Sequence, residues 1–465
     1  MNSKKRGTFS GTLGFIIVAA GSAVGLGNIW RFPYLAAKGH GGVFILCYIV
    51  LALTFGFALL TTEIAIGRKT RQSPLTAYGA LKPKWKGLGV LACLVPVIIL
   101  PYYCSIGGWV MKYFYTYAAG AGESAAQDGF FTGFISGQWS PLFWMILFLG
   151  LTAIVVYNGV KKGIEKFSKV MMPILLVIVI AIAVYSITIV YKDENGVVRT
   201  GLEGLEIYLI PDFTGLTMKQ FFSILTDAMG QLFFSISVSM GIMVAYGSYV
   251  DKKVNLMRSI NQIEIIDTLV AVLCGMMIVP AVYIFMGMEG MKGGPGLMFI
   301  SLPKVFEAMG FAGKIIGVVF FLMVVFAAAT SSVSIMEAIV SSLMDRKNWS
   351  RKKSTLVVSL YALIGAVVVC FGYNLLYFEV TLPTGDVGQI LDILDYISNN
   401  CLMPLVAILT CILIGWIVKP KVIVDEVTQG KYKFFRKGLY IVMVKVVAPI
   451  LLTILLLRSV GVLKF

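Results

Sequence analysis

Apolar segments long enough to cross a lipid bilayer follow one another along almost the whole of this chain. A membrane-spanning helix needs about 20 mostly apolar residues. Of the 465 residues, 58% are hydrophobic and only 13% are charged, and a water-soluble fold cannot bury that much apolar surface. We therefore expect an all-α polytopic membrane protein of 11 transmembrane helices without a soluble domain. The expected spans are roughly 12–36, 43–67, 88–118, 141–158, 164–190, 219–250, 259–287, 311–344, 355–378, 387–417 and 437–460.

The net charge of +16 is arranged in step with these segments. Basic residues cluster in the loops at every second apolar boundary, whereas the loops between them are acidic or nearly uncharged. This is the positive-inside pattern of membrane proteins. Because Lys4, Lys5 and Arg6 precede the first span, we expect a multi-pass protein of the cell membrane with a cytoplasmic N-terminus and an external C-terminus. The basic charge then sets topology, so we expect the lipid bilayer as a partner and no nucleic acid.

The cysteine and histidine residues give little indication of a disulfide framework, a metal site or a catalytic base. The seven cysteines all fall within apolar segments, which argues against a disulfide framework or a zinc site. His40 is the only histidine, so a histidine metal site or catalytic base is nearly excluded. The chain also has no HExxH or GxSxG motif and no paired acids at a catalytic spacing. We therefore expect no enzyme, no catalytic residue and no organic cofactor.

The first expected span is interrupted by residues that weaken a membrane helix. It contains Gly21, Gly25 and Gly27, followed by Asn28 and Arg31. Glycine lowers helix stability, and a polar or cationic side chain inside the membrane is costly unless it has partners. A helix broken at mid-depth indicates that the freed backbone groups line a cavity and bind a ligand.

The sixth expected span has a similar interruption, with three serines and a glycine in residues 231–241. Glycine and serine also allow close helix packing, which would explain either interruption by itself. Interruptions at matching positions five spans apart instead favour a binding site in an inverted repeat of five plus five helices, as in secondary transporters. We expect the first repeat at 1–190, the second at 191–417 and an additional helix 11 at 418–465.

Several longer motifs resemble those of one known family. These motifs are Gly21–Pro33, Gly41-Gly42, Glu63–Arg68, Tyr208–Phe213, Gln231–Ser235 and Ala327–Ser332. On their strength the chain resembles the neurotransmitter:sodium symporter family, and specifically its bacterial amino-acid transporters, over nearly its whole length. The resemblance implies a sodium-coupled symporter that imports neutral L-amino acids, hydrophobic or aromatic ones, by alternating access with two sodium ions.

The resemblance implies one sodium site between the first and eighth spans. Its ligands would be the carbonyls of Gly21, Val24 and Ala327 and the hydroxyls of Thr330 and Ser331. The eighth-span positions are three to four residues apart and share one helix face. The alternative is that these hydroxyls bond to carbonyls of their own helix, as threonine and serine often do in membrane helices.

The second implied sodium site uses the Ala23 carbonyl, the Asn28 and Ser235 side chains and a residue of the seventh span. The family usually has asparagine at that last position, and Asp267 is the nearest match here, with Pro280 as the other alignment. A buried carboxylate beside a cation is reasonable because each offsets the cost of desolvating the other. The alternative is an aspartate at the helix end that faces the cytoplasm.

Asp267 also bears on the question of chloride. By resemblance, chloride-dependent relatives bind the anion near the positions of Tyr48, Gln231 and Ser235, and chloride-independent relatives have an acidic residue close by instead. Asp267 is a candidate for that acidic residue. We therefore expect transport that does not depend on chloride.

The resemblance also ties the substrate class to Gly25, because monoamine transporters of the family have an aspartate there that pairs with the amine. Glycine leaves room for a substrate carboxylate, which would meet amides of the broken helix and the Tyr103 hydroxyl. A mostly apolar lining with a flexible methionine suits a large neutral side chain. The expected substrate-binding residues are Ala23, Gly25, Gly27, Ile99, Tyr103, Phe234, Ser237, Ser239, Met240 and Ile335.

Gates are implied on both sides of this site. Outside, Arg31 would face Asp395, with Tyr103 and Phe234 as an aromatic lid beneath them. Such a pair would latch the outer entrance when the substrate is bound.

On the inner side, Arg6 would pair with Asp345, with Phe9 and Tyr249 nearby. The family usually has tryptophan where this chain has Phe9, and phenylalanine keeps the apolar plug but lacks the indole donor.

Other functions fit parts of the sequence. An ion channel would show repeated filter residues or subunit symmetry, whereas the polar residues here converge on one occludable centre. A transporter-fold amino-acid sensor without coupled transport stays open, and flux measurements would distinguish it. Either a monomer or a homodimer is compatible with the sequence.

Overall fold

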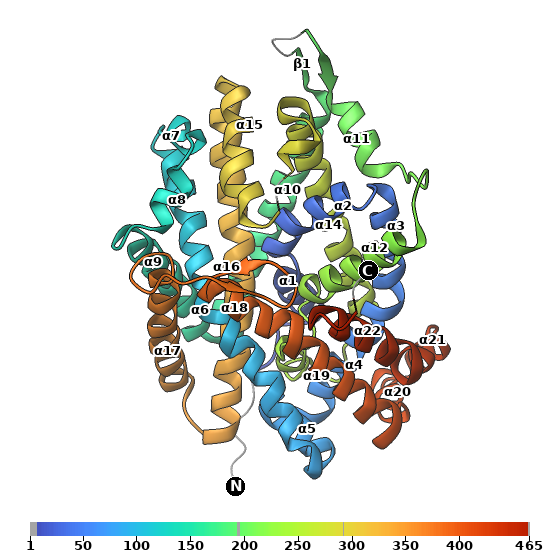
Figure 1. Ribbon diagram of the computed structural model, residues 1–465. Helices are drawn as coiled ribbons and strands as arrows, with labels where there is room; N and C mark the ends of the chain where they lie inside the picture. Colours follow the sequence, from blue (N-terminus) through green and yellow to red (C-terminus); the bar gives the residue numbers. More distant parts are fainter. Residues whose placement is uncertain (1–6, 193–195, 292, 464–465) are drawn as a thin grey trace.

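The computed structural model describes residues 7–192, 196–291 and 293–463, most of which are helical (Figure 1). Within these residues nine helices are long and apolar enough to span a membrane, or ten if one bent pair is a single span. The nine are Gly42–Thr70, Pro83–Ala118, Ser140–Tyr157, Val160–Thr188, Leu256–Met286, Phe311–Lys347, Arg351–Phe371, Ile390–Ile417 and Lys437–Ser459. Each coincides with an expected span to within a few residues, so the chain is an all-α multi-pass membrane protein.

The first expected span is the bent pair. Helix α1 (Thr12–Ala23) stops at the glycine-rich stretch, and helix resumes at Gly27–Lys38, which consists of a short π-helix and α2 (Phe32–Lys38). The two pieces are bent by 53°. At the break the backbone of Val24 is extended, with φ −74° and ψ 94°. The interruption expected from the glycines is therefore present.

The sixth expected span is also divided, into α12 (Met218–Ser235) and α13 (Ile242–Gly247). Between them Ser237, Ser239 and Gly241 have φ values of 53°, 64° and 73°. A left-handed backbone is unfavourable for a residue with a side chain and is held only where the surroundings require it. Because of this division the described residues contain at most ten long spanning units by length. The count of 11 and the inverted repeat stay predictions.

Helix α1 lies at the centre of the molecule, with long helices around it (Figure 1). It packs against α10 (Lys166–Thr188), α14 (Leu256–Met286) and α16 (Phe311–Lys347). Helix α12 packs against α3 (Gly42–Leu51) beside it. Both interruptions therefore lie in the protein interior, away from the surrounding lipid.

The remaining elements complete this bundle and its connections. The other helices of four or more residues outside the π-helical pieces are α4 (Phe57–Thr70), α5 (Pro74–Leu81), α6 (Lys86–Ala118), α7 (Gly122–Ala126), α8 (Phe130–Ile135), α9 (Ser140–Tyr157), α11 (Gly201–Leu209), α15 (Leu302–Ala308), α17 (Arg351–Phe371), α18 (Ile390–Asp395), α19 (Met403–Ile412), α20 (Lys421–Val427), α21 (Lys437–Val442) and α22 (Ala448–Ser459). Two antiparallel hairpins pair β1 (Val190–Lys192) with β2 (Val198–Thr200) and β3 (Val380–Thr381) with β4 (Val387–Gly388).

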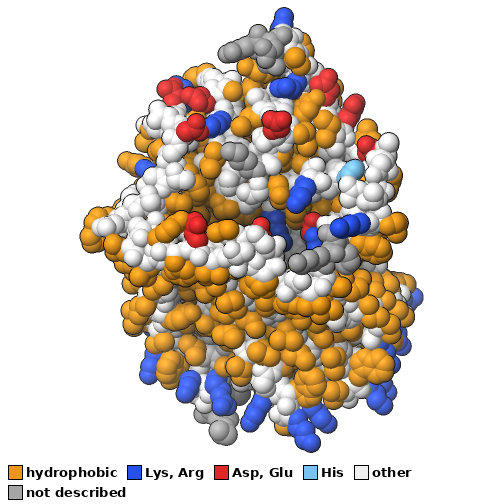
Figure 2. Space-filling view, viewed as in Figure 1, with side chains coloured by type: hydrophobic (Ala, Val, Ile, Leu, Met, Phe, Trp, Pro, Cys, Tyr) orange, Lys and Arg blue, Asp and Glu red, His pale blue; other side chains and the backbone are white. Residues whose placement is uncertain are grey.

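Charged and apolar side chains occupy different parts of the surface, with an apolar band between two polar ends. Figure 2 shows lysine and arginine side chains along the lower edge, below a broad hydrophobic band, and most of the visible acidic side chains in the upper half. The lower edge, called the basic end below, includes the α5–α6 connection with Lys82 and Lys84 and the last turn of α16 with Arg346 and Lys347. An apolar band between polar ends is what a protein surrounded by lipid requires.

Candidate functional site

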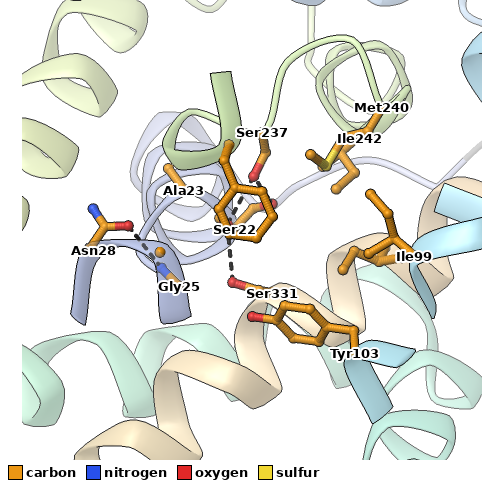
Figure 3. A pocket seen from close by; sticks show the side chains of 13 residues that line it. Ser22, Ala23, Gly25, Asn28, Ile99, Tyr103, Ser237, Met240, Ile242 and Ser331 are labelled. Atoms are coloured by element: carbon orange, nitrogen blue, oxygen red, sulfur yellow. Dashed lines mark hydrogen bonds between the residues drawn. The ribbon is translucent and has the colours of Figure 1, made fainter. Parts of the chain in front are cut away.

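The two interruptions face each other in the interior, and α16 forms a third side (Figure 3). The Ser237 hydroxyl donates a hydrogen bond to the Ser22 carbonyl over 3.0 Å, and the Ser331 hydroxyl of α16 donates to the same carbonyl over 3.2 Å. Carbonyls in the last turn of a helix lack partners within that helix. The broken end of α1 is thus held by α16 and by the α12–α13 connection.

A small cavity lies where these segments meet, and the space between its lining atoms, including space continuous with the surroundings, is about 350 Å³. Its lining residues are Ser22, Ala23, Gly25, Gly27, Asn28, Ile99, Tyr103, Phe234, Ser237, Met240, Ile242, Ser331 and Ile335. Nine of the ten residues expected to bind substrate are among them. Ile242 was missed because it follows the interruption, and only the folded connection turns it toward the cavity.

Ser239, the tenth expected residue, is not part of this lining. Its backbone amide donates to a carboxylate oxygen of Glu63 over 2.6 Å. Ser237 and Ser239 both have left-handed backbone, so no regular helical or extended period relates the directions of their side chains. Glu63 is 2% exposed, and its hydrogen bond with the Ser239 amide helps to hold the interrupted segment in place. The sequence did not reveal this role.

Tyr103 leaves a buried hydroxyl facing this cavity (Figure 3). The side chain is 3% exposed, and its hydroxyl forms no hydrogen bond with the described residues. A Cβ added at Gly25 would lie 3.5 Å from this hydroxyl and 2.7 Å from the Ser331 hydroxyl oxygen. Glycine therefore preserves a space bordered by polar groups. An unpaired buried donor costs about 1–3 kcal/mol, which a ligand with an acceptor would recover.

Phe234 lies against the other glycine of the break. A Cβ at Gly27 would come within 2.5 Å of the Phe234 ring, so only glycine admits the ring here. The Gln231 amide donates to the Gly27 carbonyl over 3.1 Å, which joins α12 to the resumed helix. These contacts place an aromatic side chain at the edge of the cavity.

Asp267 of α14 lies at a second junction, with its side chain fully buried. Its carboxylate accepts hydrogen bonds from Ser235 over 2.7 Å, from the Asn28 amide over 3.0 Å and from the Tyr48 hydroxyl over 3.1 Å. The alternative of an aspartate that faces the cytoplasm is therefore wrong. The structure brings together the three side chains expected at the second sodium site, and it adds Tyr48 to them.

Thr330 and Ser331 of α16 use their hydroxyls differently. Thr330 donates to the carbonyls of Phe326 and Ala327 over 3.0 and 3.1 Å, which is the bonding within one helix considered as the alternative. Ser331 instead reaches α1. A Cβ at Gly21 would be 3.6 Å from Thr330, so the first and eighth spans do meet at the expected place.

The groups around both expected sodium positions are carbonyl, hydroxyl, amide and carboxylate oxygens. Hard cations prefer such oxygen ligands, whereas transition metals prefer nitrogen and sulfur. Across the described parts of the chain, no three His, Cys, Asp or Glu side chains form a group that could hold a metal. The donor set thus fits an alkali cation.

The expected outer latch is not formed in this structure. Asp395 accepts hydrogen bonds from the Tyr102 hydroxyl over 3.1 Å and the Asn399 amide over 2.6 Å, and no ion pair joins it to Arg31 among the described residues. Arg31 lines an open cavity of about 1600 Å³ at the end opposite the basic end. The hydrogen bonds of the Asp395 carboxylate are made instead with Tyr102 and Asn399.

The basic end is closed by a network that the sequence analysis missed. Glu337 of α16 is fully buried and accepts two hydrogen bonds from Arg351 of α17, over 2.6 and 2.8 Å. The Tyr249 hydroxyl donates to the same carboxylate over 2.5 Å. A single glutamate inside an apolar helix was the available signal, because a buried charge needs a partner.

Aromatic side chains complete this closure. Phe9 is 7% exposed, and its ring lies 5.7 to 6.0 Å from the rings of Phe15, Tyr246 and Tyr249. Its backbone amide donates to the Tyr249 carbonyl over 3.3 Å. The segment before α1 is therefore fastened under the cavity by the residue that stands where the family usually has tryptophan.

The remaining inner-gate pair is described only in part. Arg6 lies outside the described residues, so its pairing with Asp345 stays a prediction. Asp345 accepts a hydrogen bond from the Ser73 amide over 2.6 Å. The Ser10 amide donates to Glu165 over 2.9 Å, and Glu165 pairs with Lys169 over 2.6 Å. This second attachment of the N-terminal segment was not expected either.

Comparison with known proteins gives a consistent result across the whole chain. A model of the sodium:neurotransmitter symporter family matches residues 6–120 and 136–464. Among solved structures, the chain resembles MhsT in complex with L-phenylalanine, with a TM-score of 0.84 and 34% identity. That likeness covers 98% of this chain and 100% of MhsT.

Two curated relatives show how far the similarity extends. The uncharacterized sodium-dependent transporter YhdH of Bacillus subtilis (strain 168) is 34% identical over 100% of both chains. The sodium- and chloride-dependent GABA transporter 2 of Homo sapiens is 26% identical over 91% of this chain and 75% of the relative. From the family match over almost its whole length, we conclude that the chain belongs to the sodium:neurotransmitter symporter family, whose members are transporters and not enzymes.

Proposed function

We propose that this protein is a sodium-coupled symporter that imports neutral L-amino acids with hydrophobic or aromatic side chains by alternating access. The observation that carries the proposal is the cavity between the two interrupted helices, where the unpaired Tyr103 hydroxyl borders the space beside Gly25. A substrate carboxylate in that space would accept from Tyr103 and from backbone amides at the start of the resumed helix.

The apolar part of the cavity supports the choice of side chain. Ile99, Met240, Ile242 and Ile335 line it, and they would favour a hydrophobic or aromatic group over a charged one. MhsT, which was solved with L-phenylalanine, covers this chain almost completely. L-phenylalanine is therefore the first substrate to test.

Two sodium ions fit the oxygen groups beside the cavity. One would lie between the end of α1 and Thr330 and Ser331 of α16, and the other would lie beside Asn28 and Asp267. Cation binding at either place would stabilise the interrupted backbone. An ion or substrate shifts the protein between states only by the difference between its affinities for them.

Chloride independence is supported by the position of Asp267. The Tyr48 and Ser235 hydroxyls donate to its carboxylate, so a fixed negative charge lies where chloride is expected in relatives that need it. A fixed carboxylate would balance the nearby cation, and no mobile anion would be required.

The proposed orientation places the basic end in the cytoplasm of a cell with this protein in its plasma membrane. The positive-inside rule supports this placement. The C-terminus would then lie outside, and the Glu337–Arg351 pair and Phe9 would close the cytoplasmic side. Substrate and sodium would enter through the open cavity lined by Arg31.

Uptake of radiolabelled L-phenylalanine into proteoliposomes tests the proposal. We expect accumulation with an inward sodium gradient, loss of accumulation when the gradient is collapsed, and no change when gluconate replaces chloride. Asn28→Ala should abolish sodium-coupled uptake, whereas Asn158→Ala, an exposed asparagine, should not.

Each part of the proposal has its own contrary result. Accumulation that persists without a sodium gradient would refute sodium coupling. Loss of uptake in gluconate would refute chloride independence. Sodium-dependent binding of L-phenylalanine without any flux would identify a sensor on the transporter fold instead.

A further inference from the structure

A further cavity, separate from the substrate cavity and from the open cavity lined by Arg31, opens on the hydrophobic surface between α1 and α14. It comprises about 1280 Å³, including space continuous with the surroundings. Its lining residues are Thr12, Leu13, Ile16, Ile17, Lys253, Asn255, Arg258, Gln262, Ile265, Ile266 and Tyr432. Leu13 is 65% exposed and Ile265 is 60% exposed, so in a membrane this groove faces lipid.

The groove is polar at one end and apolar further along. Arg258 lies in the first turn of α14, and Ile265 follows seven residues later on the same helix face. Seven residues advance a helix by about 10 Å. In α1, Leu13 and Ile17 are four residues apart and share a face near the start of that helix. The groove therefore runs from charged groups at the membrane surface to aliphatic groups within the membrane.

The two cations at the polar end are available for a ligand. Lys253 and Arg258 are both exposed, and neither side chain forms an ion pair or hydrogen bond with any residue that the structure describes. The neighbouring acid, Asp251, accepts from the Lys253 backbone amide over 2.9 Å. Glu264, on the same helix, is paired with Arg436 over 2.9 Å.

The backbone around these cations is well held. Asn255 caps α14 by accepting from the Arg258 amide over 3.1 Å. The Tyr432 hydroxyl donates to the Lys253 carbonyl over 3.0 Å, which ties the turn before α14 to the α20–α21 connection. The polar end is thus a preformed pair of positive charges rather than a loose loop.

We propose that this groove binds an anionic phospholipid. Its phosphate would lie between Lys253 and Arg258, and one acyl chain would follow Leu13, Ile17 and Ile265. Charge complementarity selects an anionic headgroup over a zwitterionic one, because basic pockets at the membrane surface bind anionic lipids. A lipid also matches the polar-to-apolar direction of the groove, since its headgroup and chains have the same order.

Native mass spectrometry of the purified full-length protein with phosphatidylglycerol or phosphatidylcholine tests this site without any measurement of transport. In the double variant Lys253→Gln/Arg258→Gln we expect phosphatidylglycerol affinity to fall roughly 30-fold, about fivefold for each charge. The matched control Lys82→Gln/Lys84→Gln removes two exposed charges from the same end outside the groove and should leave the affinity unchanged.

A second variant addresses the apolar part. Ile265→Trp fills the groove without changing charge, and it should also displace phosphatidylglycerol. Equal phosphatidylglycerol binding by the Lys253/Arg258 variant and its control would overturn the proposal, as would equal affinity for phosphatidylcholine. A dimer that dissociates in Ile265→Trp would assign the groove to a second copy of the chain and would overturn it too.

Discussion

The two sides of the substrate cavity are closed by very different amounts of structure. Toward the basic end, Phe9 packs against tyrosine rings and the buried Glu337 is bound by Arg351 and Tyr249. Toward the opposite end, Phe234 alone of the described residues lines both the inner cavity and the open one. An ionic and aromatic network therefore lies on one side, whereas on the other side the linings of the two cavities share only Phe234 among the described residues.

This difference has an energetic meaning. Breaking a buried ion pair by removing one partner costs about 3–5 kcal/mol, because it leaves a buried charge uncompensated. Movement of one aromatic side chain leaves no buried charge behind. We therefore expect the basic end to be harder to open than the opposite end, and the following four variants test that contrast.

The largest effect is expected from Arg351→Ala. Of the hydrogen bonds that described residues make to the buried Glu337 carboxylate, this variant keeps the one from the Tyr249 hydroxyl, so we expect a loss of about 3–5 kcal/mol from the closed basic end. Hydrogen–deuterium exchange of residues 7–14, including the Phe9 amide bonded to Tyr249, should become faster. Lys352→Ala, at an exposed neighbouring position, is the control. Unchanged exchange in Arg351→Ala would show that the pair does not hold this end closed.

Tyr103→Phe tests the substrate cavity beside Phe234. If its free hydroxyl donates to a substrate carboxylate, the lost bond is worth about 1.5–3 kcal/mol, and L-phenylalanine affinity should fall roughly 10- to 150-fold. Tyr102→Phe is the matched control, because that hydroxyl bonds to Asp395 rather than facing the cavity. Equal affinities of the two variants in sodium-dependent binding would contradict this role for Tyr103.

Tyr249→Phe separates the hydrogen bond of the basic end from its aromatic packing. The ring contact with Phe9 at 6.0 Å is kept, and the bond to Glu337 is lost. We expect a cost of about 1.5–3 kcal/mol and a rise in exchange of residues 7–14 that is smaller than in Arg351→Ala. Tyr361→Phe, which removes a hydroxyl from an exposed tyrosine, should change nothing there. A rise as large as that of Arg351→Ala would make the tyrosine, not the ion pair, the main fastening.

The smallest effect is expected from Asp395→Asn at the opposite side. In this structure Asp395 is half-buried and bonded to Tyr102 and Asn399 without an ion pair to Arg31, so we expect a change in unfolding free energy below about 1 kcal/mol. Thermal unfolding in detergent measures it beside Arg351→Ala. A destabilisation comparable to that of Arg351→Ala would mean that the outer side is held as firmly as the inner one.

Much of the candidate site could be predicted from sequence because its residues are unusual where they stand. Glycines at 21, 25 and 27 and serines at 235, 237 and 239 interrupt apolar spans, and both interruptions are present in the fold. Nine of the ten residues expected from the family resemblance to bind substrate are among the thirteen that line one cavity. The number of long spans was harder to predict from the sequence, because the length of a broken helix is not clearly defined.

The parts of the site that could not be predicted from the sequence have a common physical origin. Ser239 was expected in the lining from the family resemblance, but it is not among the lining residues, and the left-handed backbone at Ser237 and Ser239 removes any regular side-chain period there. Arg31 and Asp395 were expected to face each other as an outer latch, and this stays a prediction, because in this structure Asp395 accepts hydrogen bonds from Tyr102 and Asn399. The Glu337–Arg351 pair went unnoticed because a lone glutamate in a helix indicates a partner without naming it.

The sequence by itself determined that this chain spans a membrane repeatedly and breaks two of its helices around oxygen-rich segments. That follows from the bilayer, which penalises each polar or helix-weakening residue where it stands, so the cost is visible in the local sequence. Only the tertiary structure decided which groups meet. Asn28 and Asp267 are 239 positions apart, and yet the Asn28 amide nitrogen and an Asp267 carboxylate oxygen are 3.0 Å from each other. Likewise Glu337 binds Arg351, and Asp395 binds Tyr102. Such choices depend on how distant helices pack, and no local pattern records that distance.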